Sequence, residues 1–412
     1  MLNERRARDN DELAIGAANL LLRVGLIALA IVAPVAAVIH RRPLLVLMPI
    51  GAVLVIIGSR MSPRRRVRTL DRIRRAILSP LGLTTLALVF WAGLSLAWTP
   101  FPILALDRFF KTAGTVLVAL AALGGLPNRL RVSNANLLPI GVAAVAAGVI
   151  GAAVLAPGFV GANDPEVGTA QRATIGAIVL LWPALSALAT RDRIAIAGAL
   201  AIVVAIAAVA VWVPIAVAAL IIAMIAFVLA CARPARAGMI LGCVAAALVM
   251  AAPAIPLIVD GLFGSRIDAM GPFGIFPAWA DSVRTEGVRL LTGHGFDATA
   301  RAVLAGRIDA NAPRGLLFEV WYELGVVGAA ATAALAYFAF EAAGRSREGI
   351  APFLLAALAC IVSLCVAGLA LSQLWWLTLL CDAAICFGVA TRGQYRSERV
   401  SARVVAAERL DF

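Results

Sequence analysis

The stretch IAIAGALAIVVAIAAVAVWVPIAVAALIIAMIAFVLA (194–230) contains no charged residue. A helix needs about 20 mostly apolar residues to cross a bilayer. This stretch is therefore long enough for two crossings, and we place the turn between them at Trp212 and Pro214. It predicts two membrane-spanning helices, at 194–211 and 213–230.

The composition of the whole chain agrees with this interpretation. Of its 412 residues, 62% are apolar and 14% are charged, and the mean hydropathy is +0.96. Soluble domains are about half apolar and about a quarter charged. These values exclude a soluble enzyme, a disordered chain and a disulfide-stapled secreted domain. They indicate a polytopic membrane protein.

The excess of basic residues does not point to nucleic acid. The formal net charge is +13, but aromatic residues make up 7% and do not interleave with the basic runs. The six cysteines show no CxxC spacing and there are only two histidines, so we expect no Cys/His metal site. The cysteines are interpreted as small apolar packing residues.

The predicted fold is all-α, with about twelve transmembrane helices and one long periplasmic loop. We divide the chain into a cytoplasmic N-terminus (1–19), helices one to nine (20–258), the loop (259–315), helices ten to twelve (316–391) and a cytoplasmic tail (392–412). The twelve apolar stretches are 20–39, 43–58, 80–98, 109–126, 137–157, 173–189, 194–211, 213–230, 239–258, 316–340, 351–371 and 374–391.

The orientation follows from the arginines. The segment SRMSPRRRVRTLDRIRR (59–75) carries eight arginines and is placed in the cytoplasm, because cytoplasmic loops keep positive charge. Counting helices from it places both termini in the cytoplasm. The N-terminus lacks a clear cleavage site, so we expect the first span to remain in the protein.

The loop 259–315 falls on the predicted outer side but contains several arginines, so it departs from this charge pattern. Long loops are exempt from the rule that positive charge stays in the cytoplasm. Its segment PAWADSVRTEGVRLL (277–291) predicts one amphipathic helix near the membrane surface. Ala278, Val283 and Leu290 would form its apolar face, and Arg284 would lie toward the other face.

Polar residues with possible chemical roles gather at the predicted outer face. Arg172 opens the sixth span in QRATIGAIVLLWP (171–183), where a guanidinium suits a phosphate group or simply anchors the helix end. In LLTGHGFDA (290–298) the glycines predict a tight turn, and His294 is a candidate base or a solvated side chain. Glu319 and Glu323 share one helix face at the start of the tenth span, as capping charges or as a catalytic carboxylate.

Few charged residues fall inside the predicted spans. Asp382 lies near the middle of the twelfth span with no obvious partner in the sequence. A helix–helix hydrogen bond and a functional role remain equally open for it. Ion-coupled transporters usually carry several such residues, so this scarcity weighs against transport.

Four segments together resemble the bacterial O-antigen ligase and polymerase family of glycan-assembly membrane proteins. Their order and spacing carry the resemblance, which spans most of residues 80–390. The segments are FWAGLSLAWTPFPILALDRFFK (90–111), QRATIGAIVLLWP, LLTGHGFDA followed by APRGLLFEVWYELGVVGA (312–329), and LSQLWWLTLL (371–380).

The resemblance implies a reaction at the periplasmic face of the bacterial inner membrane. Family members move a glycan from undecaprenyl diphosphate to a lipid or glycan acceptor in lipopolysaccharide and polysaccharide biosynthesis, without a metal or nucleotide cofactor. Arg172 matches the family's arginine at its position, so the diphosphate is expected there. Arg266 and Arg284 are further candidates for the diphosphate, as substitutes for family groups that this chain lacks. From the residues themselves, Arg314 and Glu319 are expected to be catalytic, with His294 and Glu323 as further candidates.

The active-site pattern departs from that of the family. The family has a histidine and an asparagine just after the proline at the tenth-span entry, whereas Pro313 here is followed by Arg314 and Gly315. An arginine usually stands four residues before the loop tryptophan, but Ile275 holds that place before Trp279. Two alternatives stay open: a non-catalytic relative that positions other polysaccharide-assembly proteins, and a permease or exporter of lipid-linked glycan.

Overall fold

A computed structural model describes residues 2–40, 42–61, 74–127, 130–155, 168–263, 275–285, 287, 289–309, 313, 315–369 and 373–392. Nearly all of this part of the chain is helical. The helices are α1 (Leu2–Ile27), η1 (Ala28–Val32), α2 (Ala33–Ala36), α3 (Arg42–Arg60), α5 (Pro80–Ser95), α6 (Pro102–Gly125), α7 (Val132–Ala135), α8 (Leu137–Leu155), α10 (Thr169–Ala189), α11 (Ile194–Ala210), α12 (Pro214–Ala232), α13 (Pro234–Ala251), α14 (Ala254–Phe263), α15 (Ile275–Thr285), α16 (Arg289–Thr292), α17 (Ala298–Leu304), α18 (Leu316–Gly344), α19 (Ala351–Val366) and α20 (Leu374–Arg392).

Helices occur where the sequence predicts membrane spans, because a bilayer offers the backbone no other hydrogen-bond partners. Each of the twelve predicted stretches is largely helical, although the first and ninth are each divided among more than one helix. In the described ranges, eight helices are long and apolar enough to cross a membrane, and α5, α11 and α19 are shorter apolar helices. These features support a polytopic membrane protein, while the count of twelve crossings stays a prediction.

Helix α10 forms the centre of the bundle. Of its apolar span, 89% is buried inside the protein, and Trp182 is only 1% exposed. A helix that is apolar all round is expected to be enclosed by others. It packs against α8, α11, α19 and α20. These neighbours hold both ends of α10, including the end that carries Arg172.

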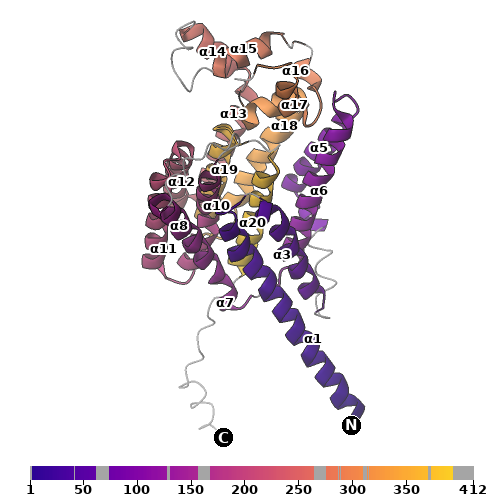
Figure 1. Ribbon diagram of the computed structural model, residues 1–412, viewed down its shortest axis with the longest axis vertical. Coiled ribbons are helices and arrows are strands. Elements are labelled where there is room, and N and C mark those ends of the chain that lie inside the picture. The colour runs from indigo at the N-terminus through magenta and orange to yellow at the C-terminus, as the bar shows by residue number, and fades with distance from the viewer. Residues whose placement is uncertain are drawn as a thin grey trace.

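The long loop and the N-terminus lie at opposite ends of the molecule. Figure 1 shows α14, α15, α16 and α17 together at the top, and the N-terminal end of α1 with α7 at the bottom. The predicted topology requires this separation, since it places the loop outside and the first helix's start inside. Which end faces the cytoplasm stays a prediction from the arginines.

The loop contains more helices than the sequence predicts. The expected amphipathic helix 277–291 is divided into α15, which ends at Thr285, and the short α16. Gly287 lies between them, and glycine is a poor helix former. Leu290 therefore does not share one continuous helix face with Ala278 and Val283. The predicted ninth span, 239–258, is likewise divided between α13 and α14.

Helix α18 is interrupted, which the sequence analysis did not predict. Gly325 has φ 63° and ψ −162°, far from helical values. The break frees backbone carbonyls on its N-terminal side, and other segments supply their donors. The Tyr322 carbonyl accepts from the His294 N–H (2.8 Å), the Glu323 carbonyl from the Gly295 N–H (2.9 Å), and the Leu324 carbonyl from the indole N–H of Trp91 (2.8 Å).

Glycines allow the loop segment 293–295 to approach this break. Gly293 has φ +72°, and a Cβ atom there would lie 2.1 Å from the Glu323 carbonyl oxygen. Gly295 has φ +96°, and its Cβ atom would lie 2.6 Å from the Thr99 side chain. Other residues rarely adopt such φ values. The tight turn predicted from these glycines is therefore confirmed.

We predict that Gly293→Ala destabilises the protein. The added Cβ overlaps backbone and the φ value is unfavourable for alanine, so the loss should be about 2 kcal/mol or more. Thermal unfolding of the purified protein, followed by tryptophan fluorescence, measures it. Gly114→Ala in α6 is the matched control, since nothing lies within 4 Å of its Cβ position. Equal stability of the two variants would contradict the packing described for 293–295.

Candidate functional site

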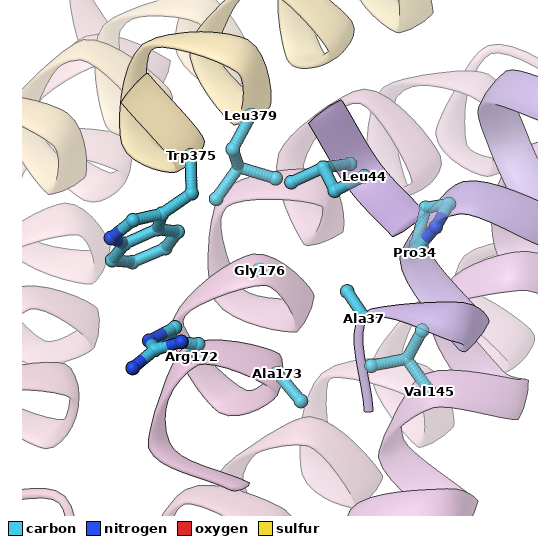
Figure 2. A pocket seen from close by; sticks show the side chains of 9 residues that line it. All are labelled: Pro34, Ala37, Leu44, Val145, Arg172, Ala173, Gly176, Trp375 and Leu379. Carbon is cyan, nitrogen blue, oxygen red and sulfur yellow. The ribbon is translucent and has the colours of Figure 1, made fainter. Parts of the chain in front are cut away.

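Arg172 lies in the first turn of α10 and is nearly enclosed. It is 5% exposed, and its guanidinium carbon lies 5.8 Å from the ring centroid of Trp375 on α20. An arginine over an indole face is attracted by the ring's negative face. Figure 2 shows the guanidinium beneath the Trp375 ring at one side of a hollow.

This Arg172 hollow has apolar walls. It encloses about 410 Å³, including the part open to the outside. Among the described residues that line it, Arg172 is the only charged one; the others are Pro34, Ala37, Leu44, Val145, Ala173, Gly176, Trp375 and Leu379. One buried cation in apolar surroundings is costly unless an anion or aromatic face compensates it. The arrangement suits an anionic group attached to a hydrocarbon chain.

A second hollow lies under the loop, beside the break in α18. It encloses about 300 Å³, including open space, and we call it the aromatic hollow. Four of its residues are aromatic: Trp279 from α15 and Phe318, Trp321 and Tyr322 from α18. Ser282, Val283, Arg289, Leu290 and His294 complete it. Aromatic faces with a few polar groups at the rim are typical of small-molecule sites.

His294 is fixed in this hollow by Tyr322. The two rings stack with centroids 4.1 Å apart and an interplanar angle of 10°. The Nδ1 atom of His294 lies 3.1 Å from the Tyr322 carbonyl oxygen. A carbonyl oxygen can only accept, so we assign the proton to Nδ1. In the neutral ring, Nε2 then holds the basic lone pair.

Glu323 holds the loop rather than lining either hollow. Its Oε2 accepts from the Asp297 N–H (3.0 Å) and its Oε1 from the Thr299 N–H (3.1 Å). The residue is 6% exposed. The two backbone donors lie at the start of α17: Asp297, with φ 62°, is its N-cap residue and Thr299 its second residue. The structure thus gives Glu323 a positioning contact, while its catalytic role stays a hypothesis.

Asp297 is itself partly enclosed beside this contact. Burial raises the pKa of its carboxyl, and Arg301 at 2.9 Å partly offsets that rise, as does Arg108. The Asp297 carboxyl therefore binds a proton more tightly in the folded protein than in the unfolded chain. Its contribution to the free energy of unfolding is present below the ordinary pKa of aspartate and is lost as the pH rises through the higher pKa of the folded state.

Glu319 is buried in the first turn of α18 and lines neither hollow. It is 7% exposed and follows Phe318, which lines the aromatic hollow. Its catalytic role stays a hypothesis.

Arg284 is not brought to either hollow, because it forms an exposed ion pair with Asp260 (2.6 Å). The predicted site residues Arg266 and Arg314 lie outside the described residues. Within the described ranges, no group of three or more His, Cys, Asp or Glu side chains is arranged to hold a metal ion. Of the predicted residues that the structure describes, Arg172 and His294 thus line two separate hollows.

Sequence reasoning missed Trp375 and Arg289. Trp375 was noted only as part of an aromatic final span, and no spacing rule relates it to Arg172, which lies about two hundred residues away. The first turns of α10 and α20 both lie at the predicted outer ends of their helices. This shared position at the predicted outer ends was the one sequence signal that could have indicated the contact between Arg172 and Trp375. Arg289 follows from no motif in the sequence.

Comparison with known proteins identifies no relative. No protein-family model matches the chain, and no curated protein matches it at a significant level. The resemblance noted from the four sequence segments therefore stays a hypothesis.

We predict that Glu323→Ala loosens the segment 293–301. It removes the acceptor for two buried N–H groups, which should cost about 2 kcal/mol. Hydrogen exchange of the loop peptides measures it, with faster exchange expected at 297–299. The exchange rate of Glu323→Gln, which keeps one carbonyl acceptor, should lie between the rates of the wild type and Glu323→Ala. Unchanged exchange in the alanine variant would show that Glu323 does not hold the loop.

Proposed function

We propose that the protein is an O-antigen ligase-like glycan transferase of the bacterial inner membrane. It moves a glycan from undecaprenyl diphosphate to a lipid or glycan acceptor on the periplasmic face. The observation that carries this proposal is the Arg172 hollow, where one buried guanidinium faces an apolar-walled space between spanning helices. The ordered sequence segments add support, because two of them supply Arg172 and Trp375.

The chemistry of the carrier explains why such a hollow is suitable. An isoprenoid diphosphate joins a long hydrocarbon chain to a doubly charged headgroup. A guanidinium donates to phosphate oxygens in a fork and stays charged at any physiological pH. Apolar walls exclude water and strengthen that attraction. Positive charge aimed at the leaving diphosphate also stabilises the negative charge that develops in the transition state.

The transfer needs one base and no redox step. An acceptor hydroxyl attacks the anomeric carbon of the donor sugar, and a new C–O bond forms. The bond between that carbon and the diphosphate oxygen breaks, and undecaprenyl diphosphate leaves with the electron pair. The hydroxyl proton goes to a base, for which Nε2 of His294 is the proposed group. The aromatic hollow would hold the acceptor sugar, because its C–H faces stack on aromatic rings.

The Arg172→Ala variant tests the donor site. In lipid nanodiscs, binding of undecaprenyl diphosphate to this variant should be at least about tenfold weaker than to the wild type, because a charge-assisted contact is lost. Arg172→Lys should bind with intermediate strength, since lysine keeps the charge but not the fork. His294→Gln is the control: it should bind the donor normally and lose transfer. Equal binding by wild type and Arg172→Ala would reject the proposal.

A gene deletion tests the function in the cell. The lipopolysaccharide and exopolysaccharide of the deletion strain should lose bands on a gel, and undecaprenyl-linked glycan should accumulate. Wild-type protein should restore the pattern and Arg172→Ala should not. Unchanged glycans in the deletion strain would count against any transferase. Restoration by Arg172→Ala, together with co-purification of a glycosyltransferase, would favour a non-catalytic partner.

Asp382 supports a second candidate function, a permease for lipid-linked glycan. It is fully buried in α20, and neither carboxyl oxygen has a hydrogen-bond partner among the described residues. Buried ionisable groups within a membrane often mark a transport path. However, Asp382 lines neither the Arg172 hollow nor the aromatic hollow.

The Asp382→Asn variant separates the two functions. A transferase should keep its wild-type glycan pattern with this variant, because the residue lines neither hollow. A permease that depends on Asp382 should fail to move lipid-linked glycan across inverted membrane vesicles. The measurement is the rate of glycan translocation beside the gel pattern of the complemented deletion strain. Loss of both glycan translocation and the wild-type gel pattern, at normal protein levels, would favour the permease.

A further inference from the structure

A third hollow lies at the opposite end of the molecule from the loop helices. It encloses about 450 Å³, including open space, between the middle of α1 and the connection from α6 to α7. Two arginines, Arg23 and Arg131, line it from these two separate segments. Asn19, Ser133 and Asn134 add polar groups to it, and Leu22, Pro127 and Leu130 add apolar ones.

Neither arginine has a compensating charge among the described residues. Arg23 and Arg131 form no ion pair or side-chain hydrogen bond with any described residue, and no described carboxylate lines the hollow. Two like charges that share one hollow repel each other unless an anion lies between them. Asn134 is only 6% exposed, and its side-chain amide has no hydrogen bond within the described ranges. The two exposed guanidinium groups and this amide border the same space.

The walls around this space are held in place by α20. The guanidinium of Arg392 donates to the carbonyls of Leu123 (2.8 Å) and Leu126 (2.7 Å), and the Leu130 N–H donates to the Arg392 carbonyl (2.9 Å). The end of α6 and the residues before α7 are therefore fixed against α20. A site built on fixed backbone needs little reordering when a ligand binds.

We propose that this hollow binds the phosphate headgroup of an anionic membrane phospholipid. The ligand chemistry is a phosphate, which two guanidinium groups and an amide suit. A lipid is favoured over a free phosphate because Leu22, Pro127 and Leu130 supply apolar surface beside the charges. The arginine pattern places this end in the cytoplasm, where anionic lipids are enriched and basic pockets between helices bind their headgroups.

The experiment compares lipid retention by three proteins. Wild type, Arg23→Gln/Arg131→Gln and Arg233→Gln/Arg236→Gln are extracted from vesicles of phosphatidylcholine with phosphatidylglycerol, and retained lipid is counted by native mass spectrometry. Both residues of the control pair are exposed, Arg233 just before α13 and Arg236 in its first turn, and the sequence places them on the same side. We expect about thirtyfold weaker phosphatidylglycerol binding in the first double variant and wild-type binding in the control.

Further variants and ligands decide the remaining outcomes. Arg23→Lys/Arg131→Lys keeps the charges, so it should retain most of the binding and show that the fold tolerates replacement. Equal lipid binding by the glutamine pair and the wild type would overturn the proposal. Displacement of the lipid by millimolar inorganic phosphate would overturn the lipid assignment in favour of a free-anion site. None of these results depends on glycan transfer.

Discussion

Hydrogen bonding at the break in α18 joins the segment 293–295 to the helical bundle. A helix inside a bilayer cannot leave carbonyls unpaired, because unsatisfied groups there cost several kcal/mol. The interruption at Gly325 is therefore tolerated only because His294, Gly295 and Trp91 donate to the freed carbonyls. The same hydrogen bonds fix the position of His294. The loop thus cannot shift without exposing the backbone of the helix.

This constraint explains why two acidic residues on one helix face have different surroundings. Glu323 is next to the break, and its carboxylate accepts from the backbone that begins α17. Glu319 lies one turn earlier and is also buried, but it accepts from neither of these backbone N–H groups. Helical spacing alone makes the pair look equivalent. The backbone interruption distinguishes them, because it brings donors only to the second residue.

The extent of sequence-based prediction differs between the bundle and the site. Apolar runs such as 194–230 predict helices well, since length and composition are what a bilayer selects. The break at Gly325 was missed because a glycine within an apolar run does not itself reveal its φ value. Arg172 was found from its place at a helix entry. Its contact with Trp375 could not be, because it depends on how α10 and α20 pack.

The three hollows show how one residue type serves different surroundings in this chain. Arg172 is enclosed among apolar groups and an indole, so its charge acts over a short distance in a space of low polarity. Arg23 and Arg131 are exposed, so salt and water weaken each charge, and an effect on a ligand requires both. If the proposed ligands bind, the enclosed arginine should interact strongly with a single anionic headgroup. The exposed pair should depend on combining its charge with the apolar surface beside it.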